Sequence, residues 1–202
     1  MKEEVDLLKY ERKYTALGYD LIAGMDEAGR GPLAGPVTVA ACVMNLGDII
    51  DGVNDSKQLT PKKRDVLFDK IVNSAIGYEI VDIDNLRIDE INILNATKEA
   101  MRTAIKRLLP IPQMLLVDAV KEEFGIPYEP IIHGDALSYS IAAASVLAKV
   151  HRDRLMGKYA EIYPEYGFEK HKGYGTKQHI EALKKYGPCP IHRKTFIKNF
   201  FA

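Results

Sequence analysis

The stretch Gly24-Met25-Asp26-Glu27-Ala28-Gly29-Arg30-Gly31-Pro32-Leu33-Ala34-Gly35-Pro36-Val37 decides the fold predicted for this chain. An apolar approach over residues 21–25 ends in two acids, and glycines and prolines then bend the backbone. A second apolar run, residues 37–44, follows without polar alternation, which is typical of a strand buried on both faces. The stretch therefore predicts a strand, a turn that carries chemistry, and a second strand.

The residue types in this turn suit a phosphorylated ligand. Gly29 and Gly31 allow positive φ and a close approach to bare backbone, while Arg30 offers a planar fork of donors that matches phosphate oxygens. Asp26 and Glu27 provide the carboxylate oxygens that Mg²⁺ or Mn²⁺ shares with substrate phosphate. The alternative is a glycine-rich hairpin that carries two solvated acids.

Length and composition indicate a globular protein. The 202 residues suffice for one domain with a proper core, and the 47% hydrophobic and 28% charged residues are ordinary for this class. No apolar run approaches the ~20 residues of a membrane span, and the acidic segment 1–6 is unlike a signal peptide. We expect a cytoplasmic protein with no membrane partner.

Charge is balanced overall but unevenly distributed. Residues 149–202 hold 12 Lys and Arg against 5 Asp and Glu, which leaves 16 against 23 of the 28 and 28 in the rest of the chain. A net charge of zero argues against coating nucleic acid through bulk charge. The asymmetry suits a basic nucleic-acid clamp beside an acidic metal site, although solvated helix faces would give the same count.

The two cysteines predict no disulfide. Cys42 lies in the apolar run 37–44, where a buried thiol behaves as a small hydrophobe. Cys189 and His192 have the spacing of zinc ligands, but no second pair accompanies them. We therefore favour an ordinary loop over a zinc site.

Hydrophobic periodicity predicts an α/β protein with a sheet of mixed direction and helices on its faces. Strands are expected at 20–26, 37–44, 76–80, 114–117 and 130–133, and helices at 3–17, 61–75, 90–109 and 139–150, with another that Thr176 caps and that ends at 186–187. The helix at 139–150 is apolar or small nearly all round, which predicts burial in the centre of the domain.

Acids recur where predicted strands end. Asp26, Glu27, Asp118 and Asp135 each close an apolar strand or follow a glycine turn, and strand ends are where sites assemble in α/β sheets. Two carboxylates ~4 Å apart repel by roughly 4 kcal/mol at an effective dielectric of 20, so convergence requires cations or protons. With two metals bound, one would activate the attacking water and the other would stabilise the leaving oxygen. Asp153, between two arginines, is expected to pair with one of them.

The motifs together resemble bacterial ribonuclease HII over residues 21–200. Those that carry the resemblance are the quoted stretch, Asp55-Ser56-Lys57, Gly134-Asp135 leading into Ser140-Ile141-Ala142-Ala143-Ala144-Ser145, Ala148-Lys149-Val150-His151-Arg152-Asp153, and Lys172-Gly173-Tyr174-Gly175-Thr176. The resemblance implies a ribonuclease H-like fold, with a mixed five-stranded sheet flanked by helices and a helical C-terminal extension. A single domain is then expected over 1–202, with a catalytic core at 19–154 and a basic helical subdomain at 155–202.

The resemblance also implies an activity and a site. The family cuts the RNA strand of RNA–DNA hybrids and incises DNA 5′ to an embedded ribonucleotide, leaving 3′-hydroxyl and 5′-phosphate ends. Its metal-binding carboxylates correspond to Asp26, Glu27, Asp118 and Asp135, its glycine-arginine-glycine element to Gly29, Arg30 and Gly31, and its substrate-sensing tyrosine to Tyr174.

Further phosphate contacts are expected at Lys57, Lys149, Arg152 and Lys172, each of which is otherwise ordinary surface charge. The predicted cofactor is Mg²⁺ or Mn²⁺, and a monomer is the expected state. Two alternatives stay open: a DNA-only nuclease of the same fold, and a non-catalytic module that binds RNA–DNA hybrids. The role of the N-terminal helix is open as well.

Overall fold

Three apolar runs form an antiparallel meander at the centre of the fold. In the computed structural model, which describes residues 5–53 and 59–200, these are β1 (Ile22–Ala28), β2 (Val37–Val43) and β3 (Gly77–Ile83). Two further strands, β4 (Met114–Asp118) and β5 (Tyr128–Ile131), join the other side of β1 in parallel. The resulting order β3-β2-β1-β4-β5 confirms the predicted mixed five-stranded sheet.

Strand register brings two of the predicted acids to one edge of the sheet. Met25 on β1 pairs with Val117 on the parallel strand β4. Each of these residues is followed directly by an acid, Asp26 and Asp118. Because parallel strands end at the same edge, the two acids become neighbours there although 92 residues separate them in the chain.

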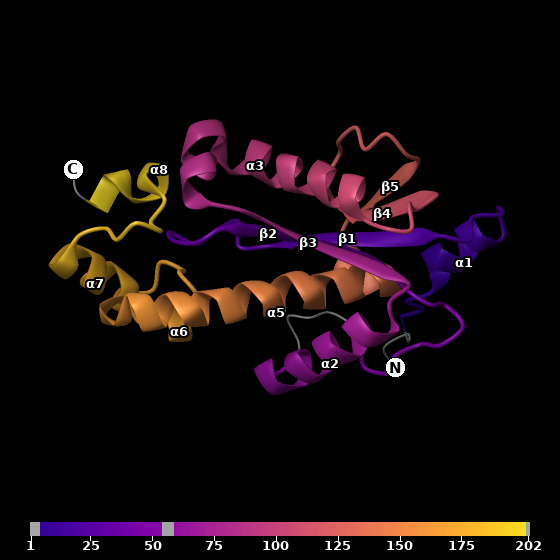
Figure 1. The fold of residues 1–202 in the computed structure, drawn as a ribbon, viewed down its shortest axis with the longest axis horizontal. Coiled ribbons are helices and arrows are strands. Elements are labelled where there is room, and N and C mark those ends of the chain that lie inside the picture. The colour runs from indigo at the N-terminus through magenta and orange to yellow at the C-terminus, as the bar shows by residue number, and fades with distance from the viewer. Residues whose placement is uncertain (1–4, 54–58, 201–202) are drawn as a thin grey trace.

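Helices cover both faces of the sheet, as Figure 1 shows. The helix α3 (Asn85–Arg107) packs on one face, and α5 (Tyr139–Ile162) with α2 (Pro61–Ser74) on the other. Alternate residues of β2 serve the two cores: Val39 and Ala41 pack toward α3, Ala40 and Cys42 toward α5. All seven residues of β2 are buried, as its apolar sequence predicts.

The central helix α5 lies unusually close to β1. A Cβ on Gly24 would stand 2.0 Å from the backbone carbon of Ser140, so only glycine fits at this crossing. The residues of α5 from Tyr139 to Ala148 are all buried, which confirms the central helix. It continues twelve residues beyond the predicted end at residue 150. In this second half the helix has two sides, since Arg152 and Met156 are buried while Arg154 and Lys158 are exposed.

Local capping explains where other helices begin. Thr60 accepts a hydrogen bond from the backbone N–H of Lys63, with Pro61 in the first position of α2, as predicted. The helix α3 begins at Asn85, five residues before the predicted start, because Asp84 caps it. It breaks at Asn92, which has φ of 66° and whose Oδ1 accepts from the N–H of Asn95.

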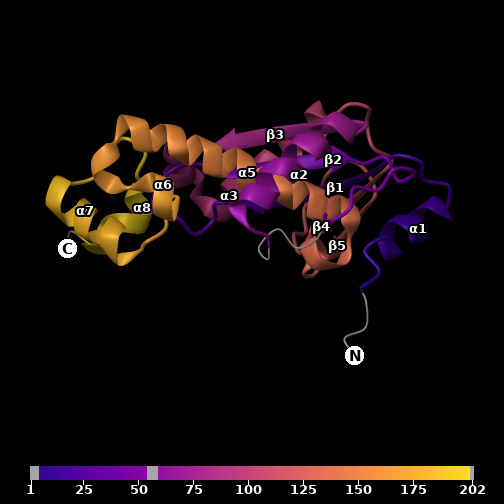
Figure 2. The same cartoon turned by 90° about the horizontal axis from the view of Figure 1, so that it is seen from below.

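The two ends of the molecule carry short helices. At one end lies α1 (Lys9–Thr15), shorter than the predicted 3–17, of which residues 1–4 lie outside the described part. At the opposite end lie α6 (Phe168–His171), α7 (Lys177–Tyr186) and α8 (Lys194–Ile197), as Figure 2 shows. The short helix α4 (Gly134–Leu137) precedes α5, and 3₁₀ turns span Pro164–Tyr166 and Lys198–Phe200.

The predicted division of the domain at residue 154 falls inside α5, which runs unbroken from the sheet to the C-terminal helices. Among the described residues, no helix combines the length and apolar character that crossing a membrane demands.

Candidate active site

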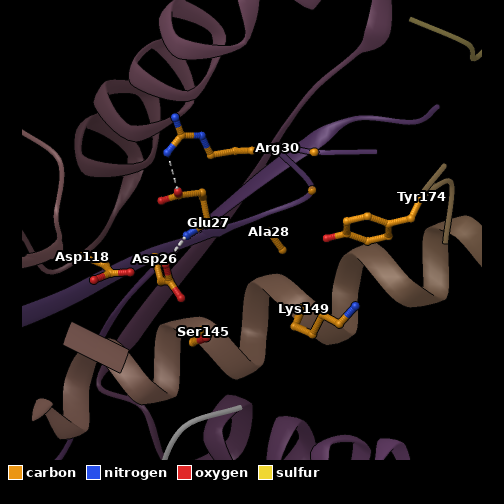
Figure 3. Close-up of a pocket in the computed structure, with 10 residues that line it drawn as sticks. Asp26, Glu27, Ala28, Arg30, Asp118, Ser145, Lys149 and Tyr174 are labelled. Atoms are coloured by element: carbon orange, nitrogen blue, oxygen red, sulfur yellow. Dashed lines mark hydrogen bonds and ion pairs between the residues drawn. The ribbon is translucent and has the colours of Figure 1, made fainter. Parts of the chain in front are cut away.

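A cavity of about 280 Å³ opens where β1 and β4 end, shown in Figure 3. Residues from four separate segments line it: Asp26, Glu27, Ala28, Gly29, Arg30, Gly31, Asp118, Ser145, Lys149 and Tyr174. Three of the four predicted acids, the glycine loop and the tyrosine thus border one space. Tyr174 points its hydroxyl toward the acids from across this cavity.

Asp26 is buried in an environment that opposes its charge. Its side chain is 5% exposed, and its Oδ1 accepts a hydrogen bond from the N–H of Glu27 at 2.7 Å. Burial, and then the charges of Glu27 and Asp118, raise the pKa of this carboxyl well above its usual value, while Ser145 acts in the opposite sense. The ionised form of Asp26 therefore needs a compensating positive charge.

Glu27 has a compensating charge within the loop. Arg30 Nη1 lies 3.2 Å from Glu27 Oε1, and Figure 3 shows the carboxylate of Glu27 turned toward this guanidinium while Asp26 faces Ser145. The two adjacent acids diverge because neighbouring side chains of a strand point to opposite sides. The side chain of Arg30 is 44% exposed and lines the cavity, so a ligand can reach it.

Asp118 and Asp135 are linked through the backbone. Asp118 Oδ1 accepts from the N–H of Gly134 at 2.8 Å, which ties the end of β4 to the start of α4. Asp135, the next residue, is 3% exposed and does not line the cavity. The structure therefore brings Asp26, Glu27 and Asp118 to the cavity and keeps Asp135 behind Gly134.

The donor chemistry of this site fits a divalent cation. Carboxylate oxygens are the ligands that Mg²⁺ and Mn²⁺ take. The positive charge of a bound cation would oppose the repulsion from Glu27 and Asp118 that helps to raise the pKa of Asp26. Within residues 5–53 and 59–200, no three His, Cys, Asp or Glu side chains are already grouped closely enough to hold a metal ion. The four predicted ligands would therefore have to turn their side chains to converge on it.

Gly29 and Gly31 differ in how strongly the structure requires a glycine at their positions. Gly29 has φ of 88°, and a Cβ there would stand 2.0 Å from Nε of Arg152. Gly31 does not use positive φ, and its nearest neighbour for a Cβ is a ring carbon of Tyr174 at 3.7 Å. Gly29 is therefore required by the fold, whereas a Cβ on Gly31 would only make an ordinary contact with the ring of Tyr174.

The sequence did not reveal the residue that holds this loop in place, Arg193. Its guanidinium is fully buried and donates to the carbonyls of Gly29 at 2.6 Å, Arg30 at 2.9 Å, Gly35 at 3.0 Å and Pro36 at 3.0 Å. Burial, and then the charge of Arg152, lower the pKa of Arg193 to about 9, so the group stays charged at pH 7. Nothing in its sequence neighbourhood distinguishes it from a surface arginine.

Arg152 shares this structural role, and the prediction that it contacts substrate phosphate is corrected. Its side chain is 1% exposed and donates to the carbonyls of Pro36, Lys172 and Ala34 at 2.9, 3.0 and 3.1 Å. Every nitrogen of the guanidinium is thus used inside the protein. The residue braces the turn instead of facing a ligand.

The predicted lysines have mixed outcomes. Lys149 lines the cavity, and its Nζ lies 2.8 Å from Asp153 Oδ1, so Asp153 pairs with this lysine and not with an arginine as expected. Lys172 is half-buried and lies outside the cavity lining. Lys57 lies outside the described residues.

Cys189 and His192 lie in the segment that follows α7 and contact each other there. The N–H of Cys189 donates to Nδ1 of His192 at 2.9 Å, and Cys189 Sγ lies 3.1 Å from the same nitrogen. The other ring nitrogen of His192 faces His179 at 3.0 Å. Both nitrogens of His192 are therefore engaged within the protein.

The mixed five-stranded sheet, with acids at the ends of neighbouring strands beside this cavity, and the similarities given below place the protein in the ribonuclease H class of phosphodiester hydrolases. The sequence profile of the ribonuclease HII family matches residues 23–201, and the chain belongs to this family. It is 54% identical to ribonuclease HII of Acetivibrio thermocellus over 97% of this chain and 77% of that one. It is 53% identical to ribonuclease HII of Caldicellulosiruptor saccharolyticus over 98% of each.

Solved structures agree with this assignment. The ribonuclease H2 of Pyrococcus horikoshii is 32% identical, with a TM-score of 0.70 over 89% of this chain and 98% of that one. The fold also matches Bst-RNase HIII, solved in complex with Mn²⁺, with a TM-score of 0.62 at 16% identity over 83% of this chain and 63% of that one. The chain is thus an endoribonuclease that acts on RNA–DNA hybrids, and enzymes of this type depend on divalent metal ions.

Proposed function

We propose that Asp26, Glu27, Asp118 and Asp135 hold two divalent cations, Mg²⁺ or Mn²⁺, and that the cavity beside them hydrolyses a phosphodiester bond. When bound, such ions activate the attacking water and stabilise the leaving oxygen. The oxygen of that water bonds to phosphorus as the bond from phosphorus to the 3′ oxygen breaks. The products are a 3′-hydroxyl and a 5′-phosphate.

The observation that carries this proposal is that the acids and a second group of residues, proposed to recognise a sugar, face each other across one cavity. Asp26, Glu27 and Asp118 form one side and Tyr174 the other, as Figure 3 shows, and Gly31 lines the same cavity close to the ring of Tyr174. Because Gly31 has no side chain, a ligand in the cavity can approach its backbone beside the ring of Tyr174. A group bound there would present its phosphate to the acids.

Recognition of RNA follows from the same surface. The 2′-hydroxyl is the group that separates RNA from DNA at a given sugar. In our proposal the backbone at Gly29 and Gly31 bonds this hydroxyl, Arg30 holds a phosphate, and the ring of Tyr174 stacks on the sugar. One such contact reads one ribonucleotide, so a single ribonucleotide in DNA would be a substrate and incision would fall on its 5′ side.

The alternatives are less well supported. A module that only binds hybrids gains nothing from buried acids that face phosphate, and the raised pKa of Asp26 is a cost that binding alone does not require. A DNA-only nuclease has no use for a surface that reads the 2′-hydroxyl.

A labelled DNA duplex with one ribonucleotide tests the proposal, with Mg²⁺, with Mn²⁺ and with chelator, beside an all-DNA duplex. We expect metal-dependent incision only on the 5′ side of the ribonucleotide. Equal cutting of the all-DNA duplex would contradict recognition of the 2′-hydroxyl. Binding without cleavage in either metal would favour the non-catalytic module.

Some expectations remain predictions. These are the monomeric state, the cytoplasmic location, a division into a core at 19–154 and a C-terminal subdomain, and phosphate contacts at Lys57, Lys149 and Lys172. Lys149 is the best supported of the three lysines, because it lines the cavity on the side of Tyr174.

A further inference from the structure

Three buried histidines lie beneath the turn that carries Tyr174. His171, His179 and His192 are 9%, 0% and 2% exposed, and the rings of His171 and His179 stack with centroids 4.5 Å apart. None of them lines the catalytic cavity. They belong to the C-terminal helices and the loop after them, and the catalytic role proposed above does not use them.

The hydrogen bonds of His179 and His192 determine which nitrogen of each ring carries a proton. His179 Nδ1 lies 2.9 Å from the carbonyl oxygen of Tyr174, so Nδ1 must be the donor and Nε2 the acceptor. His192 Nδ1 accepts from the N–H of Cys189, so its Nε2 carries the proton. The 3.0 Å contact between the two Nε2 atoms is then a hydrogen bond from His192 to His179.

His171 supports the same turn from the other side. Its Nε2 donates to the carbonyl of Tyr166 at 2.8 Å, which leaves Nδ1 to accept from the N–H of Gly173 at 3.3 Å. Its own carbonyl accepts from the N–H of Tyr174 at 2.9 Å. The backbone on both sides of the tyrosine is therefore bound to histidines.

Each ring in this chain of bonds must be neutral. A second proton on either His179 or His192 would set two N–H groups against each other. Burial is the main cause that lowers the pKa of His179 and lowers that of His192 to about 4. At pH 7 both rings are thus in the state that the geometry requires.

The turn needs such support because Tyr174 has little of its own. It stands between Gly173, which has φ of 84°, and Gly175, and its side chain is 44% exposed. Glycine neighbours leave the backbone free to rotate, and an exposed ring is not fixed by packing. The bonds to the carbonyl of Tyr174, from His179 and from the N–H of Thr176, therefore fix the backbone from which the ring projects.

We propose that His179 and His192 are positioning residues, which hold Tyr174 against the ribose of the substrate through this chain of neutral imidazoles. The proposal rests on the role proposed for Tyr174 in reading that ribose. It assigns no proton transfer to the histidines, because the chain of bonds ends at a backbone carbonyl and reaches no reacting atom.

The test compares variants of His179 on the duplex with one ribonucleotide. His179→Leu removes both bonds of the ring, whereas His179→Asn keeps an N–H directed at the carbonyl of Tyr174. Since small misplacements of a substrate contact are costly, we expect His179→Leu to lower kcat about tenfold with KM changed less than about twofold. His179→Asn should recover most of the loss.

Leu183→Ala controls for destabilisation, because Leu183 is fully buried on the same helix and forms no side-chain bond to the turn. It should lower the melting temperature at least as much as His179→Leu yet keep kcat within about twofold of wild type. Equal losses of kcat in both variants would overturn the proposal, since they would reflect loosening of the helix alone.

A double variant decides whether the histidines act through Tyr174. If they do, His179→Leu has no further effect on kcat once Tyr174→Ala is present. Fully additive losses would overturn the positioning role. If Tyr174→Ala alone leaves cleavage unchanged, the role proposed for Tyr174 fails; if it lowers cleavage but His179→Leu does not, only the present inference fails.

Discussion

The two ends of the stretch Gly24–Val37 are stabilised in opposite ways. At its start, Asp26 is buried among other acids, and its charge is opposed by burial and by Glu27 and Asp118. At its end, the carbonyls of Gly29, Arg30, Ala34, Gly35 and Pro36 are bound by two buried guanidinium groups, those of Arg152 and Arg193. Acids thus stand close together at one end, and two buried guanidinium groups bind the backbone at the other.

This difference assigns separate tasks to neighbouring residues. The arginines fix the backbone of the turn, so the acids next to it keep their positions despite the repulsion between them. A rigid support lets a site carry an unfavourable arrangement that only a ligand relieves. Variants at the acidic end should therefore lose activity without losing stability, and variants at the braced end should lose stability first.

The largest expected effect is that of Asp26→Asn on cleavage. A loss of about 10³-fold or more is expected, because a neutral amide contributes no charge to a cation that supplies several kcal/mol of catalysis. Cleavage of the single-ribonucleotide duplex under saturating Mg²⁺ measures it. Asp65→Asn, at an exposed acid on α2, is the control and should stay active.

The same variant should be as stable as wild type or more so. Since the pKa of Asp26 is raised above 3.8 in the folded state, its favourable contribution is complete below pH 3.8 and is lost as pH rises. The advantage of Asp26→Asn should thus be greater at pH 7 than at pH 4 in urea unfolding without metal. A less stable variant at pH 7 would mean that Asp26 holds the fold.

Arg193→Met should lower the free energy of unfolding by about 3 kcal/mol, because it leaves several buried carbonyls without donors. Urea unfolding measures the change, with Arg154→Met as the control, since Arg154 is half-exposed and pairs with acids at the surface. Equal stability of the two variants would contradict the claim that Arg193 stabilises the turn.

Gly29→Ala and Gly31→Ala should separate stability from activity at two positions only two residues apart. Gly29→Ala should cost about 2 kcal/mol or more, since φ of 88° and a contact of 2.0 Å with Arg152 both oppose a side chain. Gly31→Ala should melt like wild type but cut about tenfold more slowly, because its methyl group intrudes where the sugar is proposed to bind. Full activity of Gly31→Ala would argue against that approach of the sugar.

A change in pH should affect stability through His192, next to Arg193. Its folded-state pKa of about 4 lies below the ordinary 6.5, so the stability it contributes is present above pH 6.5 and is lost as pH falls toward 4. Between pH 7 and 5 this amounts to about 2 kcal/mol. Unfolding of wild type and His192→Gln at both values measures it, and equal pH dependence in the two would refute the assignment.

Much of the fold was predictable because its signals are local. The apolar runs of β1, β2 and β4 and the caps at Thr60 and Thr176 are properties of neighbouring residues. The errors have local causes too: Asp84 caps α3 earlier than its apolar pattern begins, and Asn92 interrupts it. The position of the acids at strand ends could be predicted from the sequence in the same way.

The site was predictable only in part, because the role of a charged side chain depends on what surrounds it. Arg152 and Lys149 occur three residues apart in one motif, yet one is buried on carbonyls and the other lines the cavity. Arg193 belongs to no motif that suggested a role, and it contacts a turn more than 150 residues earlier. Sequence spacing carries no information on such distant pairings.

By itself the sequence determined the family and the sheet and predicted the acids of the site, because these follow from hydrophobic periodicity and from long local motifs. Only the tertiary structure decided which arginines brace the turn, which glycine is free to face a ligand, and which nitrogens of the histidines carry protons. Those properties depend on burial and on partners brought together by folding, and neither is defined until the chain has packed.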